Sequence, residues 1–211
     1  MIVVHDMPQR SEEWYAIRLG RVTGSVASKY FNLNGKLKSD NVIYNNISKQ
    51  VSELILGYDD SNKADSIDMY RGRSMEGEAL ADLYSKDWSD IGFVTNTELP
   101  NMGVSPDAVL YIGGEIIKGA EVKCPTSTKH INYMLNGNVP NDYKIQIGMQ
   151  FIIMPTIESV IFRSYNPQFD SKTSVFDVKV ERGDWKSFLD ELNKSAIRLG
   201  EIINESVNNL S

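Results

Sequence analysis

The chain has few of the residues from which cross-links and soft-metal sites are built. Its 211 residues include one cysteine, Cys124, and two histidines, His5 and His130. A single cysteine excludes a disulfide within the chain and a zinc or iron–sulfur site with several cysteine ligands from one chain. The two histidines lie in unrelated contexts, so neither a histidine-based metal site nor a serine triad is supported.

Long apolar segments are also missing. No apolar run approaches the about twenty residues that a membrane-spanning helix needs. Residues 1–6 do not show the basic segment followed by a long apolar segment that is typical of a secretory signal. We therefore expect a cytoplasmic protein with no membrane partner.

A basic excess is the third absence. The chain has 22 Lys and Arg against 28 Asp and Glu, a formal net charge of −6. Proteins that bind nucleic acid usually carry a basic excess, so the total charge gives no support to such a partner. It does not exclude one, because a local basic groove can coexist with acids that cluster at a metal site or on an outer face.

The length and the 41% hydrophobic content fit one domain with a sizeable core. We expect a single α/β domain over residues 1–211, with a central mixed sheet flanked by helices. Hydrophobic periodicity and capping signals predict its elements. The expected helices are 11–20, 25–31, 39–56, 66–89, 126–135, 140–154 and 184–207, and the expected strands are 93–99, 103–111, 115–123, 159–165 and 174–180.

The most informative stretch is residues 102–125, which reads as a β-hairpin with its turn at Gly113-Gly114. Glu121 and Lys123 are two residues apart on the second strand, so their side chains point to one face, and Val122 points to the other. The hairpin can bring Asp107, on the first arm, beside Glu121.

Two acids and a lysine in a half-buried place have two interpretations. One is a structural salt bridge, although desolvation offsets much of the attraction in a buried ion pair. The other is a magnesium site, because Mg²⁺ takes oxygen ligands and needs only one or two carboxylates. In that case the lysine would orient or deprotonate the attacking water.

A second motif lies near the N-terminus, where Trp14 and Arg18 precede Thr23 and Ser25. Thr23 and Ser25 fall at an expected helix start, where free backbone N–H groups can hold an anion. An arginine just upstream would complete a phosphate pocket. A helix–turn–helix with ordinary caps also explains these residues, and the local chemistry alone favours it.

Several motifs occur in the order of one known family. Pro106-Asp107 followed by Glu121-x-Lys123 resembles the PD-(D/E)xK nuclease signature. Ser-Pro-Asp at 105–107 and Glu-Val-Lys-Cys-Pro at 121–125 are similar to its lambda-exonuclease, or YqaJ-type viral recombinase, branch. The resemblance extends to Trp-x-x-x-Arg-Leu-Gly-x-x-Thr-x-Ser at 14–25, Gly-x-x-x-Glu at 72–76 and Tyr-x-x-Gln at 143–146.

The resemblance implies a restriction-endonuclease-like core and a set of site residues. Glu76, Asp107, Glu121 and the carbonyl of Val122 would hold the metal, and Lys123 would position the attacking water beside Asp107 and Glu121. Substrate-binding residues are implied as well. Those for DNA and its 5′-phosphate would be Arg18, Ser25, Ser105 and Gln146.

The implied function is Mg²⁺-dependent DNA exonuclease activity, 5′→3′ on double-stranded ends, which leaves 3′ single-stranded overhangs for phage-type recombination. Two Mg²⁺ ions are expected, with Mn²⁺ as a substitute. The expected partners are double-stranded DNA ends, a single-strand annealing recombinase and two further copies of the chain in a homotrimer. The protein would then be a phage or prophage product in a bacterial cytoplasm.

Two other functions fit the same residues. The first is a PD-(D/E)xK endonuclease or structure-selective nuclease. The second is a nuclease-like DNA-binding subunit without turnover, which the intact set of acids and lysine disfavours.

Overall fold

The computed structural model describes residues 1–60 and 67–211, with side chains from residue 70 onward in the second range. Its centre is a five-stranded mixed sheet in the order β3-β6-β7-β8-β9. Strands β7 and β8 are parallel, and every other neighbouring pair is antiparallel. The strands are β3 (Trp88–Ser89), β6 (Ala108–Ile112), β7 (Glu115–Lys123), β8 (Ser159–Tyr165) and β9 (Val175–Glu181).

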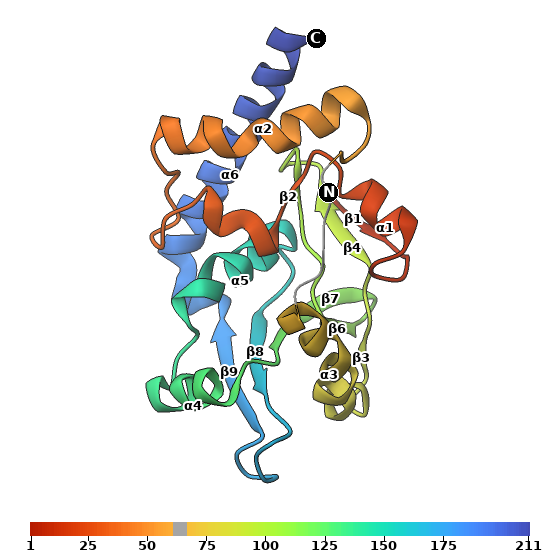
Figure 1. Cartoon of the computed structure of the whole chain (residues 1–211), viewed down its shortest axis with the longest axis vertical. Coiled ribbons are helices and arrows are strands. Elements are labelled where there is room, and N and C mark those ends of the chain that lie inside the picture. The colour runs from red at the N-terminus through yellow and green to blue at the C-terminus, as the bar shows by residue number, and fades with distance from the viewer. Residues whose placement is uncertain (61–66) are drawn as a thin grey trace.

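Helices cover both faces of this sheet (Figure 1). The larger core joins Val109, Val160 and Phe162 of the sheet to residues of α2, α5 and α6. The smaller core joins Ala108, Ala120 and Val122 to α3. The helices are α1 (Glu12–Ile17), α2 (Asp40–Leu56), α3 (Ile67–Tyr84), α4 (Ser127–Asn136), α5 (Asn141–Ile153) and α6 (Lys186–Leu210), with short 3₁₀ helices at Gly24–Lys29 and Arg182–Trp185.

Successive side chains of β7 point to opposite faces of the sheet, one toward α3 and the other toward α5. Val122 packs in the core beneath α3, whereas Glu121 hydrogen-bonds to residues of α5 on the opposite face. This alternation between the two faces from one residue to the next is the ordinary geometry of a β-strand. The expected mixed sheet flanked by helices is therefore confirmed.

Two small sheets attach the N-terminal segment to the centre. β1 (Ile2–His5) pairs antiparallel with β4 (Phe93–Asn96), and β2 (Val22–Thr23) pairs parallel with β5 (Met102–Gly103). They place residues 1–30 beside the segment that leads into β6. Residues far apart in the sequence thereby share one region of the molecule (Figure 1).

Local sequence signals account for several element boundaries. Ser11 caps α1, with its side chain accepting a hydrogen bond from the Trp14 amide at 3.2 Å. The β6–β7 turn consists of Gly113 and Gly114, at φ 62° and 85°. Both residues adopt a conformation that L side chains disfavour, which explains the glycine pair.

Some expected boundaries are wrong. The helix expected over 66–89 ends at Tyr84, and Trp88 and Ser89 instead form a strand paired with Leu110 and Val109. The segment 25–31 is mostly a 3₁₀ helix, and the strand expected over 93–99 ends at Asn96. The expected strand 103–111 is two strands, β5 and β6, with Asp107 just before the second. The strands β1 and β2 were not expected, because short edge pairings carry little periodicity.

A buried arginine fastens α3 to the sheet. Arg163 of β8 is 3% exposed and forms ion pairs with Asp82 of α3 and Asp177 of β9. It also donates to the carbonyl of Ala79 at 2.9 Å. These bonds join one helix and two strands, so they restrain the position of α3, which carries Glu76.

No helix in the described part of the chain combines the length and the apolar character needed to cross a bilayer.

Candidate active site

Backbone pairing places Asp107 beside β7. Its amide donates to the carbonyl of Ala120 at 3.1 Å, and its Oδ2 accepts from the amide of Val122 at 2.5 Å. Glu121 lies between these two positions on the same strand. The hairpin register thus brings the two acids together, as the sequence pattern predicts.

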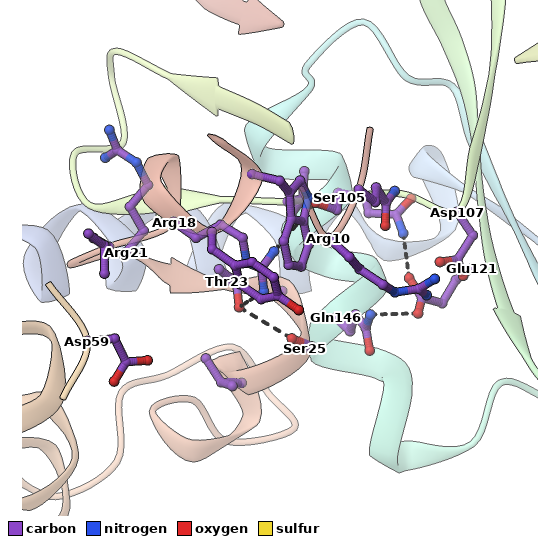
Figure 2. Close-up of a pocket in the computed structure, with 18 of the residues that line it drawn as sticks. Arg10, Arg18, Arg21, Thr23, Ser25, Asp59, Ser105, Asp107, Glu121 and Gln146 are labelled. Carbon is purple, nitrogen blue, oxygen red and sulfur yellow. Dashed lines mark hydrogen bonds between the residues drawn. The ribbon is translucent and has the colours of Figure 1, made fainter. Parts of the chain in front are cut away.

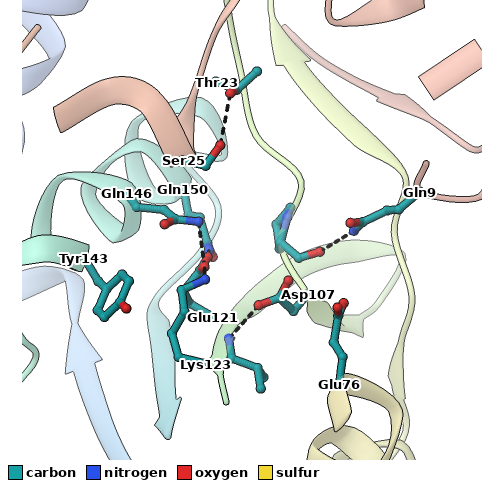
Figure 3. A network of polar contacts seen from close by, with 12 residues as sticks. Gln9, Thr23, Ser25, Glu76, Asp107, Glu121, Lys123, Tyr143, Gln146 and Gln150 are labelled. Carbon is teal, nitrogen blue, oxygen red and sulfur yellow. Dashed lines mark hydrogen bonds and ion pairs between the residues drawn. The ribbon is translucent and has the colours of Figure 1, made fainter. Parts of the chain in front are cut away.

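Glu121 is 1% exposed and is surrounded by donors. Gln146 donates to its Oε1 at 2.6 Å, Gln150 donates to its Oε2 at 2.8 Å, and Lys123 forms an ion pair with Oε1 (Figure 3). Gln146 and Gln150 are four residues apart on α5, so they share one face of the helix. Both oxygens of this carboxylate are therefore held by protein groups.

Gln150 also carries an unpaired buried atom. Its Oε1 has no hydrogen-bond partner among the described residues. A Cβ at Gly119 would lie 2.6 Å from this oxygen, so only glycine at 119 leaves room for it. The amide is therefore held in this orientation mainly by its bond to Glu121.

The third acid, Glu76, comes from α3 on the other side of Asp107 (Figure 3). Its side chain is 26% exposed and forms an ion pair with Arg10 at 2.7 Å between Nη2 and Oε2. Glu76, Asp107 and Glu121 line one cavity. The structure thus brings together the three acids that the family resemblance indicates.

The local electrostatics show a shortage of positive charge around Asp107. Burial, together with the charge of Glu121, raises the pKa of Asp107 to about 8. Burial alone would lower the pKa of Lys123, but the charges of Glu121 and Asp107 outweigh it and raise that pKa. One lysine is therefore not enough to keep the pKa of Asp107 at its ordinary value.

This donor set has the chemistry that a hard divalent cation requires, namely carboxylate oxygens in one cavity. A cation there would also supply the positive charge that Asp107 lacks. No group of three or more His, Cys, Asp and Glu side chains within the described residues is already gathered tightly enough to hold an ion. Metal binding would therefore require Glu76 and Glu121 to exchange some of their protein partners.

A second polar cluster lies in the same cavity, around Arg18 (Figure 2). The guanidinium stacks on the Trp14 ring at 3.8 Å and donates to Thr23 Oγ1 at 3.3 Å and Ser105 Oγ at 3.4 Å. Ser25 Oγ lies 3.3 Å from Thr23 Oγ1. The residues of the N-terminal motif and Ser105 therefore form one group, as expected.

The partners of Arg18 are all neutral in the part of the chain that the structure describes: two hydroxyls and the aromatic rings of Trp14 and Phe93. Burial lowers its pKa to about 10, so the group stays charged at neutral pH. A half-buried cation whose partners are neutral has the chemistry needed to bind an exogenous anion.

The cavity that contains both clusters has a volume of about 1410 Å³. Its charge differs in sign from that of the whole chain. Seven of its lining residues are cationic, namely Arg10, Arg18, Arg21, Lys29, Lys49, Arg73 and Lys123, and five are acidic, namely Glu53, Asp59, Glu76, Asp107 and Glu121. A net charge of −6 is therefore compatible with a polyanion in this cavity.

A match to a protein-family model shows to which family the chain belongs. The model of the YqaJ-like viral recombinase domain matches residues 13–156, which include every site residue described above except Arg10. The chain belongs to this family.

Solved structures support the fold of this YqaJ-like protein. An alkaline exonuclease from Laribacter hongkongensis, LHK-Exo, is similar with a TM-score of 0.77 and 21% identity, over 95% of this chain and 96% of that one. LHK-Exo in complex with dAMP gives the same TM-score at 22% identity and the same coverage. A phage-related exonuclease from Haemophilus somnus 129PT is similar with a TM-score of 0.55 and 12% identity, over 90% and 96% of the two chains. A search of curated proteins found no significant match.

Three residues of the YqaJ-like site make contacts that the sequence did not predict. Gln150, one helical turn after Gln146, lies outside the family motifs and yet donates to Glu121 directly. Gln9 and Arg10 are missed altogether. Gln9 donates to the carbonyls of Ile91 and Pro106, both at 2.9 Å, and Arg10 neutralises Glu76. Only their position just before the Trp14 motif could have signalled a role.

The raised pKa of Asp107 predicts a pH-dependent stability in the YqaJ-like protein without metal. Between about pH 4 and pH 8 the unfolded chain releases this proton while the folded chain keeps it, so the free energy of unfolding should fall across that window. The side chain of Asp107→Asn cannot titrate. The free energy of unfolding of this variant, relative to that of the wild type, should therefore increase as the pH rises. Urea unfolding in EDTA at pH 5, 6, 7 and 8 measures the difference.

The matched control is Asp142→Asn, which changes an exposed acid near the start of α5. Its difference from the wild type should stay flat over the same pH range. A flat difference for Asp107→Asn as well would contradict the assignment of a raised pKa.

Proposed function

We propose that this protein is a Mg²⁺-dependent DNA exonuclease that degrades double-stranded ends in the 5′→3′ direction. The observation that carries the proposal is one cavity with two subsites, an anion site around Arg18 and an acid–lysine site around Asp107, in a chain of the YqaJ-like family. The similarity to a solved alkaline exonuclease and a solved phage-related exonuclease supports it.

In this proposal Glu76, Asp107, Glu121 and the carbonyl of Val122 hold two Mg²⁺ ions, and Mn²⁺ can replace them. The ions would supply Lewis acidity and offset the negative charge that builds on the phosphate oxygens during hydrolysis. Carboxylate and carbonyl oxygens are the ligands that these ions prefer.

Lys123 acts on the attacking water. Its ammonium is held by the ion pair with Glu121 and lies 5.3 Å from the centroid of the Tyr143 ring. That restraint points a proton-carrying group into the space beside Asp107, where a water can be oriented by hydrogen bonding. Gln146, which contacts the same carboxylate, would touch the strand being cut.

The anion site accounts for the direction. A terminal 5′-phosphate bound by Arg18, Ser25 and Ser105 would leave the next phosphodiester facing the acids across the same cavity. Removal of 5′ nucleotides leaves a 3′ single-stranded overhang, which is the substrate of a single-strand annealing recombinase. LHK-Exo has been solved with dAMP, a nucleoside monophosphate, which supports a mononucleotide product.

The acid–lysine site is tested by substitution. Asp107→Ala and Glu121→Ala should each reduce Mg²⁺-dependent digestion to background, because each removes a proposed metal ligand, and Glu121→Ala also removes the ion-pair partner of Lys123. Lys123→Ala should lose about 100- to 10,000-fold, the usual contribution of a positioned proton-transfer group. End-labelled linear duplex, with and without EDTA, gives the rates.

Glu115→Gln is the matched control, because it changes an exposed glutamate on the same strand and should digest normally. A covalently closed circle in the same reactions separates an exonuclease from an endonuclease of the same superfamily. Substantial Mg²⁺-dependent cleavage by a well-folded Asp107→Ala variant would contradict the assignment of Asp107 to the active site.

The direction is tested at the anion site. Wild-type protein should digest 5′-phosphorylated duplex faster than 5′-hydroxyl duplex, and Arg18→Ala should lose about 10- to 100-fold on the phosphorylated form, as expected for hydrogen bonds between charged groups. Competition between the two duplexes measures the preference.

Arg198→Ala, which removes an exposed arginine of α6, is the control and should keep the preference. If the wild type ignores the 5′-phosphate and Arg18→Ala digests normally, the Arg18 cluster is a purely structural helix turn.

We extend the proposal to assembly. An acidic chain whose cavity is cationic can hold a duplex best when copies enclose it, with the acidic surfaces outward. Head-to-tail contacts close into a ring when the rotation per subunit matches. We expect a homotrimer by sedimentation velocity without DNA, and a monomer mass throughout the micromolar range would contradict it.

A further inference from the structure

Arg10 has an unusual backbone conformation at the edge of the cavity. It has φ of 73°, a left-handed conformation that non-glycine residues rarely adopt. The neighbouring backbone is fixed on both sides, by the bonds from Gln9 to Ile91 and Pro106 and by the Ser11 amide donating to the carbonyl of Pro8 at 3.2 Å. Arg10 lines the cavity from this turn.

Arg10 reaches Glu76 from a different element than the other site residues. Its guanidinium lies 2.7 Å from Glu76 Oε2, and the two side chains are 42% and 26% exposed. Partly exposed ion pairs contribute little to stability, because water competes with both partners. A divalent cation that binds Glu76 therefore has only a weak competitor to displace.

The position of Arg10 also allows a second binding partner for its guanidinium. It lies in the same cavity as the Arg18 cluster and the acids, with Thr23 and Ser25 on one side of it and Asp107 on the other (Figure 2). On the proposed function, the DNA backbone must cross this space between its terminal phosphate and the acids. A guanidinium released from Glu76 can pair with a phosphate through two parallel hydrogen bonds.

We propose that Arg10 is an exchangeable counter-cation and a DNA-phosphate ligand, an inference that rests on the proposed function. Without a divalent cation it neutralises Glu76. When a cation takes Glu76, Arg10 is released and binds a phosphate of the DNA that enters the cavity. Cation binding and DNA binding then strengthen each other through one side chain.

Thermodynamic linkage makes the proposal quantitative. If the cation raises the affinity for DNA by some factor, DNA must raise the affinity for the cation by the same factor. A purely structural Arg10–Glu76 pair would give a change in stability on mutation and no change in this factor. The coupling, rather than activity, is therefore the decisive readout.

The variant that removes the side chain most safely is Arg10→Gly, because glycine accepts a φ of 73° without strain. Arg10→Gln is the second variant and keeps a side chain of similar length without the charge. Arg198→Gln is the matched control, since it removes an exposed arginine that pairs with Glu201 and Glu205 on α6. Thermal unfolding in EDTA confirms that each variant is folded.

Two binding measurements test the proposal. Calorimetry with Mg²⁺ and no DNA should show about 2- to 5-fold tighter binding to Arg10→Gly and Arg10→Gln than to the wild type, the factor expected from removal of a partly exposed competing ion pair. Anisotropy of a 5′-phosphorylated duplex is then measured in EDTA and in Ca²⁺, with gels to confirm that no cleavage occurs. The gain in DNA affinity on adding Ca²⁺ should shrink about 10-fold in both variants, while affinity in EDTA stays unchanged.

The outcomes separate the inference from the function on which it rests. If folded Arg10→Gly binds Mg²⁺ no more tightly than the wild type, or if its Ca²⁺-dependent gain in DNA affinity is unchanged, the inference is overturned. If the wild type binds no Mg²⁺, or if Asp107→Asn binds it equally well, the proposed metal site itself has failed.

Discussion

The site depends on one backbone contact, the hydrogen bond from the Val122 amide to the carboxylate of Asp107. It joins the segment before β6 to β7 and leaves Asp107 and Glu121 as close neighbours in a half-buried place. Two such acids repel each other and lose hydration, so the rest of the site is arranged to compensate. Lys123 and the amides of Gln146 and Gln150 surround Glu121, whereas the Asp107 carboxylate accepts only the Val122 amide among the described residues and keeps a raised pKa.

That asymmetry explains how an acidic protein can be suited to a polyanion. Glu121 is already surrounded by donors and Glu76 is paired with Arg10, and the cavity around them is lined by more cations than acids. A divalent cation would add positive charge beside Asp107, the acid that lacks it. The charge that matters to DNA is that of the cavity, because charges beyond about 10 Å are largely screened at moderate salt. The formal net charge of −6 mainly reflects residues outside the cavity.

The parts of the structure that the sequence predicts are those with local causes. The Gly113-Gly114 turn and the alternation along β7 fix the hairpin, and the Ser11 cap fixes the start of α1. The parts that it misses depend on contacts between distant segments. The Arg10–Glu76 pair joins residues 66 positions apart, and no periodicity or cap encodes it. The strand at Trp88–Ser89 is likewise made by its partner, since two residues beside β6 become a strand only when the sheet is present.

The relation between the two subsites follows from the three residues at 105–107. Ser105 accepts hydrogen bonds from Trp14 and Arg18, Pro106 offers its carbonyl to Gln9, and Asp107 accepts from the amide of Val122. One short segment therefore touches both the anion site and the acid site. The distance between them is set by covalent geometry, at most about 7 Å between Cα atoms two residues apart, and not by the packing of separate domains. On the proposed function, a cavity built in this way would hold an end-bound phosphate and the next phosphodiester in a fixed relation, which is what removal of one nucleotide at a time requires.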